Sequence, residues 1–490
     1  MASLSTALSY AVSGLTTSAA QSAVVARNVA NANDSNYVRK IANVITLPGG
    51  TSAVASYDRS ADKRLFDKLL SVSSSAMGKQ AILEALTQLS ATVGDPQSDS
   101  SITSLAGRLQ QSLAAYEANP SSSVLAADAF QSASSLAQGL NDASAAVQDV
   151  RAAADQELSA SVARINTLLD QFKIANDSVV RGTGTTSDLT DNLDQRDRIL
   201  KQLSEELGIR TITRPNNDIA IYTDSGVTLF ETNARKVTLE PTQAFQAGVV
   251  GNAVYVDGVR ITGTPSAMPV ASGKLQGLAE VRDKITVAYQ AQLDEVARGL
   301  VEMFAETDQQ AVPSLPAATG LFSYGGSPAV PPPGVMVNGM AASIKINPLA
   351  DPAQGGQPSF IRDGGFNGGV YTYSGSGEAG FQSRIAQLIT AFDAPMSFDA
   401  ASQIGGLMSI KSFSSNSASW VEQRRQTADK AAEFETALKS RTSDALLRVT
   451  GVNIDEEMAA MLDLEKSYQA SSKVLTVIDG MLATLMEAIR

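Results

Sequence analysis

The sequence predicts a mainly α-helical protein with inserted β structure. A long helical, coiled-coil rod is formed by both chain ends, and a β-rich head domain lies in the middle. The 17 prolines leave three long stretches free, residues 1–47, 121–214 and 396–490, where uninterrupted helices are allowed. Apolar residues in these stretches recur at spacings of three and four, the period of one helix face. Between the stretches, short runs of alternating apolar and polar residues indicate strands.

The N-terminal segment carries a narrow apolar stripe at heptad spacing. The positions of the stripe are Leu4, Leu8, Ala11, Leu15, Ser18, Ser22, Val25 and Val29. Such a stripe is typical of a coiled-coil seam. Residues 1–26 carry no charge, but they lack the basic start and the continuous apolar run of a signal peptide or membrane span. We therefore expect neither a cleaved signal nor insertion into a membrane.

A very long helix is predicted for residues 120–181. Asn119 is its expected N-cap, Pro120 its first position and Gly182 its stop. Its apolar stripe consists of Leu136, Leu140, Ala143, Val147, Val150, Ala154, Leu158, Ile165, Leu168, Phe172 and Val179. At 1.5 Å per residue this helix is ~90 Å long, which is unlike a compact globular enzyme.

β structure is expected between the helices. Ile219 and Ile221 alternate with polar or small residues, as in a half-buried strand. Asp257 and Gly258 form the turn of a two-residue hairpin. Weaker strands are expected within residues 313–375, where prolines and glycines are concentrated.

The C-terminal segment repeats the heptad pattern of the N-terminal one. Its seam is Met461, Leu464, Tyr468, Ser471, Leu475, Ile478, Leu482, Leu485 and Ile489. Asn453 and Glu456 are a plausible capping pair at its start. Neither terminal stripe has a covering partner within its own segment, so we expect both to pack on other helices in an assembly. The predicted assembly interface is Leu4, Leu8, Leu15, Val25, Val29, Met461, Leu464, Tyr468, Leu475, Ile478, Leu482, Leu485 and Ile489.

Further helices are predicted at residues 60–93, 280–305 and 402–450. Together these patterns predict three kinds of domain. Terminal coiled-coil axial segments comprise residues 1–38 and 452–490. The helical rod comprises residues 39–208, 275–312 and 376–451. The inserted β-rich outer domain comprises residues 209–274 and 313–375.

Composition excludes several kinds of chemistry. The chain has no Cys and no His, so it has no catalytic Ser-His-Asp triad, no cysteine nucleophile, no His- or Cys-ligated metal and no disulfide. Its net charge of −12 argues against nucleic-acid binding, which needs Lys and Arg to displace counterions from phosphates. We predict no catalytic residue, no cofactor and no metal site.

Two acidic clusters have alternative interpretations. Asp191, Asp194 and Asp197 recur every three residues and resemble ligands for a hard cation. We favour the i,i+4 ion pairs Asp194–Arg198, Asp197–Lys201 and Lys201–Glu205 along a solvated helix face, because one straight helix cannot direct all three carboxylates to one ion.

The second acidic cluster is Asp455, Glu456 and Glu457, which could form a paired-acid site of glycosidase type. We favour ordinary helix-start acids. The glycine-rich stretches contain no P-loop, because neither Gly-Lys pair is followed by Ser or Thr.

Both chain ends resemble the signatures of bacterial flagellar axial proteins. The N-terminal signature is Ser13-Gly14-Leu15, Asn28-Val29-Ala30-Asn31-Ala32-Asn33 and Tyr37-Val38-Arg39. The C-terminal signature runs from Thr450 to Met458 and continues with Tyr468-Gln469-Ala470 and Lys473-Val474. The family usually has Gly before the tyrosine, where this chain has Asn36, a residue that tolerates the same left-handed turn.

The interior narrows the resemblance to the hook-associated protein 1 family. The matching residues are Leu193-Asp194-Gln195-Arg196-Asp197, Leu203 to Gly208, Asn119-Pro120-Ser121, Ile165-Asn166 and Ser397-Phe398-Asp399. The resemblance implies a structural subunit, not an enzyme, at the junction between the flagellar hook and filament. It implies self-assembly into a ring or helical layer, and partners that include the hook protein, hook-associated protein 3 and a flagellar export chaperone. It also implies an extracellular location reached through the flagellar export channel.

Two alternative functions remain open at this point. A hook or distal-rod protein shares the same ends. A secreted carboxylate-dependent hydrolase, housed in the β insertion, requires two carboxyl groups ~5–10 Å apart in a cleft.

Overall fold

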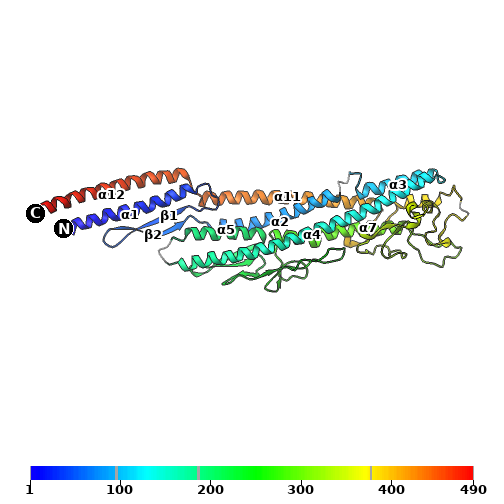
Figure 1. Ribbon diagram of the computed structural model, residues 1–490, viewed down its shortest axis with the longest axis horizontal. Helices are drawn as coiled ribbons and strands as arrows, with labels where there is room; N and C mark the ends of the chain where they lie inside the picture. Colours follow the sequence, from blue (N-terminus) through cyan, green and yellow to red (C-terminus); the bar gives the residue numbers. More distant parts are fainter. Residues whose placement is uncertain (1, 94–97, 185–187, 376–377, 489–490) are drawn as a thin grey trace.

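The protein is an elongated helical rod, and both of its termini lie at the same end (Figure 1). The computed structural model describes residues 2–93, 98–184, 188–375 and 378–488. The long helices are α1 (Ala2–Ala30), α2 (Lys63–Val93), α3 (Ile102–Ala118), α4 (Ser123–Gly182), α5 (Thr190–Glu206), α7 (Thr286–Met303), α11 (Ile410–Thr450) and α12 (Ile454–Ala488). The predicted fold class, mainly α with inserted β, is confirmed. No helix of the described segments is long and apolar enough to cross a membrane.

The central helix α4 begins three residues later than predicted. Asn119 caps the end of α3, a helix that was not predicted, and Pro120 lies in the turn between α3 and α4. The N-cap of α4 is Ser122, whose hydroxyl accepts a hydrogen bond from the backbone N–H of Leu125. A proline can start a helix, but here the preceding chain is already helical and must turn back first.

The predicted stripe of α4 is its buried face, with one correction. Leu169 is fully buried and Leu168 only partly, because the seam steps by four and then three residues from Ile165 to Phe172.

Two other predicted helices differ from the structure at their starts. The helix predicted for residues 402–450 begins only at Ile410, as α11, because a short strand precedes it at Gly406–Met408. Helix α6 (Lys274–Glu280) runs through one π-helical turn, Val281–Ile285, into α7.

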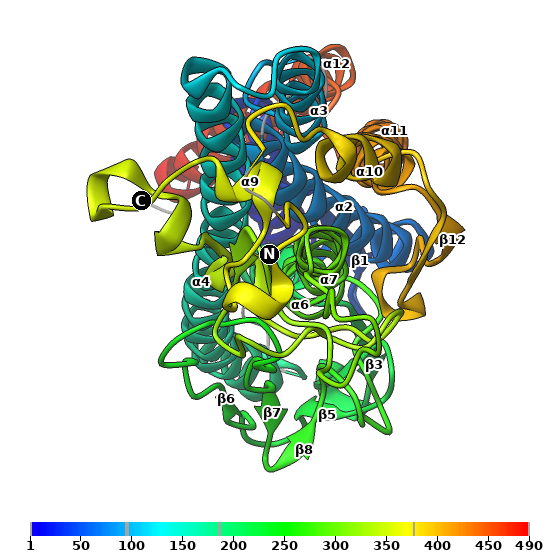
Figure 2. The ribbon, with the colours of Figure 1, turned by 90° about the vertical axis from the view of Figure 1, so that its right-hand side faces the viewer.

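The first β insertion lies along α4, and its first strand also contacts α2 (Figures 1 and 2). An antiparallel sheet has the order β3 (Ile209–Thr213), β4 (Ile219–Thr223), β5 (Thr228–Phe230), and a second has the order β6 (Val237–Thr238), β7 (Tyr255–Val256), β8 (Val259–Arg260). The predicted hairpin turn is confirmed: Asp257 and Gly258 have φ of 46° and 81°. Phe230 packs edge-on against Phe172 of α4, with ring centroids 5.0 Å apart.

Residues 313–375 lie at the end of the rod opposite the termini, apart from the first insertion (Figure 1). Their strands are β9 (Phe322–Ser323) and β10 (Lys345–Ile346); after them come β11 (Met396–Phe398) and β12 (Gly406–Met408). Short helices such as α8 (Met340–Ser343) and turns make up most of the rest. Leu321, Phe322, Met340 and Ile361 belong to the same continuous core as α4 and α7, so this segment is packed into the rod.

A β-hairpin that was not predicted follows the N-terminal helix. Its strands are β1 (Lys40–Thr46) and β2 (Ser52–Arg59). The turn between them contains Pro48, Gly49 and Gly50, a breaker between two apolar runs that was readable in the sequence. A side chain at Gly50 would crowd α1, because a Cβ there would lie 2.9 Å from the hydroxyl oxygen of Tyr10. The hairpin covers one side of α1, and α12 covers another.

Candidate assembly interface

The two terminal helices, α1 and α12, pack against each other along the predicted stripes (Figure 1). In α1, Val25 is buried and Leu4, Leu8, Leu15 and Val29 are half-buried. In α12, Ile478 is buried and Met461, Leu464, Leu475 and Leu482 are half-buried. Each stripe is therefore covered, within one chain, by the stripe of the opposite terminus.

The remaining predicted interface positions differ in their surroundings. Tyr468 and Leu485 are 44% and 39% exposed, and Ile489 lies outside the described residues. Ser471, the polar position in the seam, faces Gly14: a Cβ on Gly14 would lie 3.2 Å from the Ser471 hydroxyl oxygen. This small-on-small contact lets the two helices approach closely.

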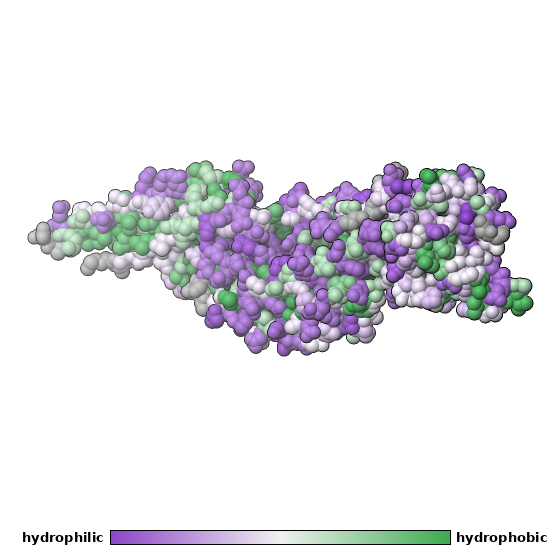
Figure 3. Space-filling model, turned by 45° about the vertical axis from the view of Figure 1, so that its right-hand side comes forward, coloured by the Kyte–Doolittle hydropathy of each residue, from purple (hydrophilic) through white to green (hydrophobic). Residues whose placement is uncertain are grey.

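A second apolar stripe of α12 faces away from α1 and was not predicted. We call it the outer stripe; its residues are Val474, Val477 and Met481, which lie on one side of the helix. Their exposed fractions lie between 49% and 62%. Figure 3 shows hydrophobic surface along the terminal helices. The signal is present in the sequence, since Val474, Val477 and Met481 follow at spacings of three and four, beside the longer heptad seam.

A polar joint connects the terminal helix pair to the rod. At its centre Asn28 is 1% exposed. Its side-chain oxygen accepts hydrogen bonds from Tyr37 Oη and from the backbone N–H of Lys40, at 2.8 and 3.0 Å. Its side-chain nitrogen donates to the Lys40 carbonyl and to Glu457 Oε2, both at 2.9 Å. Burial raises the pKa of Tyr37, which stays a protonated donor.

Glu457 is more than a helix-start acid. Its side chain is 1% exposed, and Oε1 accepts a 2.6 Å charge-assisted hydrogen bond from Arg39 Nε. Asn453 caps α12 as predicted, since its side-chain oxygen accepts from the backbone N–H of Asp455. The residues of the two terminal signatures thus meet in one buried contact.

The aspartates of α5 are paired with cations from the N-terminal segment. Arg59 lies 3.1 Å from Asp194 and 2.7 Å from Asp197, and Lys40 pairs with Asp191 and lies 3.7 Å from Asp194. Burial raises the pKa of Asp194, an effect that Arg59 and Lys40 oppose.

The i,i+4 pairs that we expected among these residues were wrong. Arg198 lies instead near Asp34, at 3.8 Å, and Lys201 donates to Asn36. Glu205 is paired with Lys439 of α11. A single helix in isolation offers only its own neighbours as partners, whereas here the N-terminal segment and α11 lie against α5. In the described segments no cluster of acidic residues is arranged to hold a metal ion.

Buried carboxylates of α7 and its extension hold the distal loops. Asp294 accepts hydrogen bonds from the backbone N–H groups of Gly339 and Ala341, both at 2.9 Å, and burial raises its pKa to about 6. Glu306 accepts from Phe366 and Asn367 in the same way. These carboxylates are occupied by loop backbone, which does not favour the hydrolase alternative.

Two buried arginines tie the first insertion to the rod. Arg151 of α4 donates to the carbonyl oxygens of Gln246, Val249 and Arg282. Arg282, in the π-helical turn, donates to the carbonyl of Asn252 and pairs with Asp155. No sequence motif indicated this pair, because its partners are mostly backbone carbonyls.

Comparison with known proteins identifies relatives over both the interior and the C-terminus. Residues 86–320 match the family model of the flagellar hook-associated protein FlgK helical domain. Residues 445–488 match that of the flagellar basal body rod FlgEFG protein C-terminal region.

Individual relatives are distant. Flagellar hook-associated protein 1 of Salmonella typhimurium and that of Salmonella typhi are each 24% identical over 256 residues. The matched part is 49% of this chain and 45% of each relative, so the chain spans about half the length of these relatives. The solved structure of the flagellar hook junction protein FlgK from Burkholderia pseudomallei is 20% identical, with a TM-score of 0.43, over 53% of this chain and 47% of that chain.

Proposed function

This chain is a relative of flagellar hook-associated protein 1, and from that premise we propose that it is a structural subunit joining the flagellar hook to the filament. The observation that carries the proposal is the match of residues 86–320 to the FlgK helical domain. A rod or hook protein shares the C-terminal match but is not favoured by that helical domain. The family is structural, and we assign no catalytic activity.

We propose that subunits assemble through the terminal helix pair. The outer stripe leaves several large apolar side chains more than 40% exposed on one helix, which is costly in a free subunit and is relieved when a neighbour covers them. The exposed seam residues Tyr468 and Leu485 extend this surface. The covered seam residues then act indirectly, by holding α1 and α12 in the geometry that presents the outer stripe.

The proposed partners follow from the family. They are further copies of this chain in a ring or helical layer, the hook protein, hook-associated protein 3 and an export chaperone. We place the subunit outside the cell, in the flagellum.

We also propose a division of the chain that modifies the predicted domains. The axial part comprises residues 2–59 together with α12, because the hairpin β1–β2 packs on α1. The remaining helices and both insertions form the rod, because one core of buried residues connects them.

Electron microscopy of a strain that lacks this chain tests the junction role. We expect hooks without filaments, with unpolymerised filament protein in the medium. Complementation with the full chain should restore filaments. Filaments that remain attached in the deletion strain would exclude a junction role, and a missing hook would indicate the rod or hook alternative.

A further inference from the structure

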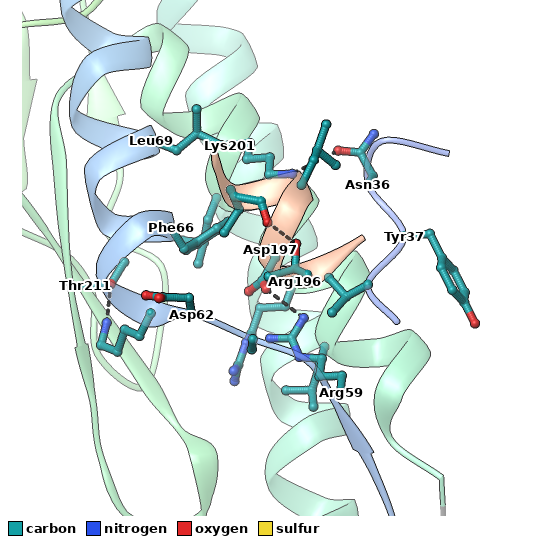
Figure 4. A pocket seen from close by; sticks show the side chains of 18 of the residues that line it. Asn36, Tyr37, Arg59, Asp62, Phe66, Leu69, Arg196, Asp197, Lys201 and Thr211 are labelled. Atoms are coloured by element: carbon teal, nitrogen blue, oxygen red, sulfur yellow. Dashed lines mark hydrogen bonds and ion pairs between the residues drawn. The ribbon is translucent and has the colours of Figure 1, made fainter. Parts of the chain in front are cut away.

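A cavity of about 290 Å³ lies beside the joint, where α2, α5, β3 and the end of α11 meet the loop after α1. Figure 4 shows Phe66 and Leu69 of α2 opposite Asp197 and Lys201 of α5, with Asn36 beside them. The lining and the carboxylates paired with it hold as many negative as positive groups: Asp62, Asp67, Asp194 and Asp197 against Arg59, Lys63, Arg196 and Lys201. The charges of the cavity are therefore balanced within one chain. The exposed apolar surface beside the joint is instead the start of α12.

The first turns of α12 carry an exposed apolar face, which we call the basal patch. Its residues, Ile454, Met458 and Leu462, follow at spacings of four and so lie on one side of the helix. Their exposed fractions are 46%, 48% and 54%. Figure 3 shows hydrophobic surface where the terminal helices meet the rod. The single chain thus leaves two apolar faces of α12 exposed, the basal patch and the outer stripe.

These two faces lie on opposite flanks of the seam that packs on α1. At 3.6 residues per turn, each is turned roughly 110° from the seam, in opposite directions around the helix. At 1.5 Å per residue, Met458 and Val477 are ~28 Å apart along the helix axis. Neither face can cover the other within one straight helix, but each can reach a neighbouring molecule on its own side.

A positive charge lies beside the outer stripe. Lys473 is exposed and stands one turn before Val477, on the same side of the helix. Within the described residues Lys473 forms no ion pair. Asp479 follows Val477 by two positions and therefore points to another side of the helix.

The basal patch has negative charges beside it. Asp455 and Glu465 are exposed, and each lies within one turn of a basal-patch residue. Neither carboxylate is paired with a cation in the part of the chain that the structure describes. Lys466 and Asp463 also lie at the upper end of the patch, but they are 3.7 Å apart and offset each other. The two faces of α12 are therefore both apolar and of opposite charge at their edges.

We propose that the outer stripe of one copy of this chain packs on the basal patch of the next copy, which lies parallel to it and is displaced by ~28 Å along the rod. In this register the outer stripe meets the basal patch residue by residue: Val474 against Ile454, Val477 against Met458, and Met481 against Leu462. Lys473 then lies close to Asp455 of the next copy. A second copy is the occupant because it brings both an apolar face and the charge of the required sign.

The proposed contact is heterologous, since each copy presents a different face to each of its two neighbours. Such contacts build a ring or a helical layer, whereas a two-fold contact stops at a pair. A row of copies covers both exposed faces of every subunit within it. The inference deepens the proposed assembly through the terminal helix pair and rests on it.

Disulfide crosslinking tests the contact, because the chain has no cysteine and an introduced pair is the only one present. The double variant Met458→Cys/Val477→Cys is co-expressed with an equal amount of the unmodified chain, which supplies any assembly function that the variant lacks. Isolated hook–filament particles are then oxidised and analysed on a non-reducing gel. A disulfide requires Cα atoms ~4.4–6.8 Å apart, so a crosslink reports direct contact. We expect crosslinked dimers and trimers from the double variant and only monomers from each single variant.

Two further pairs define the register. Leu462→Cys/Met481→Cys lies one turn further along the same contact and should crosslink as well as the first pair. Met458→Cys/Thr476→Cys is the matched control, because Thr476 is exposed but points away from the outer stripe. The control pair should crosslink at least tenfold less.

Three results would overturn the proposal. Dimers without trimers from the double variants would show a two-fold contact. Dimers from Val477→Cys alone would show that the outer stripe faces itself. Double variants that enter the particles but stay monomeric would show that the two faces do not meet. Attached filaments without a crosslink refute this contact and leave the junction role intact, whereas attached filaments in the deletion strain refute the junction role itself.

Discussion

The side-chain nitrogen of Asn28 donates a 2.9 Å hydrogen bond to Oε2 of Glu457, although 429 positions separate the two residues in the chain. Both side chains are 1% exposed, and each belongs to one of the two terminal signatures. This contact ties the N-terminal and C-terminal helices to the same point of the rod. It gives a physical reason for a polar asparagine within an otherwise apolar and small-residue helix.

Replacing Asn28 by Ala should loosen the terminal helix pair. The change removes the Asn28 hydrogen bonds to Oε2 of Glu457 and to the backbone N–H and carbonyl of Lys40, and each buried group left unsatisfied costs ~1–3 kcal/mol. We expect the pair to open more easily by about 2–4 kcal/mol, which is roughly a 30- to 800-fold faster amide exchange in α1 and α12. Hydrogen exchange measures this, with α4 as internal reference. Asn33→Ala, at an exposed position, is the control; equal exchange in both variants would contradict the role of Asn28.

Substitutions in the seam and in the outer stripe should separate subunit stability from assembly. Leu475→Ala removes a half-buried contact with α1 and should destabilise the terminal pair of the free subunit by about 1–2 kcal/mol. Val477→Asp changes a side chain that is 62% exposed and should leave the free subunit unchanged, while it prevents filament attachment. Hydrogen exchange of the subunits and microscopy of the strains measure the two effects. Thr476→Ala, between them on the exposed surface, should change neither.

The opposite ranking of these two variants would require another interface. If Val477→Asp cells carry normal filaments, the outer stripe does not contact a neighbour in the assembly. If Leu475→Ala leaves exchange in α12 unchanged, the seam does not hold the pair together.

Asp294 should make stability depend on pH. Its folded-state pKa is raised to about 6, above the usual value of 3.8, so the folded state binds more protons than the unfolded state between these pH values. Its contribution to stability is therefore full below pH ~4 and is lost as the pH rises through about 6. The shift corresponds to at most about 3 kcal/mol. Asp294→Asn should remove this part of the pH dependence, as measured by denaturant unfolding from pH 4 to 7.

The control for Asp294→Asn is the same substitution at an exposed aspartate. Asp128→Asn, at an exposed position of α4, should leave the pH profile of unfolding unchanged. A profile for Asp294→Asn that is parallel to that of the unmodified chain would show that Asp294 does not titrate in this range.

Replacing Arg151 by Met should release the loop between β6 and β7 from α4. The carbonyl oxygens of Gln246 and Val249 would lose their donor, and a buried acceptor without a partner costs ~1–3 kcal/mol. We expect faster limited proteolysis at residues 239–252 and a lower melting temperature. Arg181→Met, at the exposed end of α4, should behave like the unmodified chain. Unchanged protection of the loop in Arg151→Met would mean that other contacts hold it.

The sequence by itself determined where most of the long helices lie and which face of them is apolar, although it did not reveal α3 or the hairpin β1–β2. Local periodicity and capping specify these features, so the stripe of α4, the seams of α1 and α12 and the Asp257-Gly258 turn could be predicted. The exceptions have local causes as well. Asn119 caps the end of the preceding helix α3. Asn36 does not adopt the left-handed conformation that was expected, and its backbone N–H donates to the side chain of Asp34.

Only the tertiary structure decided what covers each face. The seams of α1 and α12 close on each other, and Asp194 and Asp197 pair with Arg59 instead of with residues on their own helix. The reason is physical: periodicity specifies the apolar direction of a helix but not the identity of its partner. The partner is selected by shape and charge between segments that lie far apart in the chain. The cavity at Arg196 and the outer stripe follow from the same packing, because they are the surfaces that remain once these partners are in place.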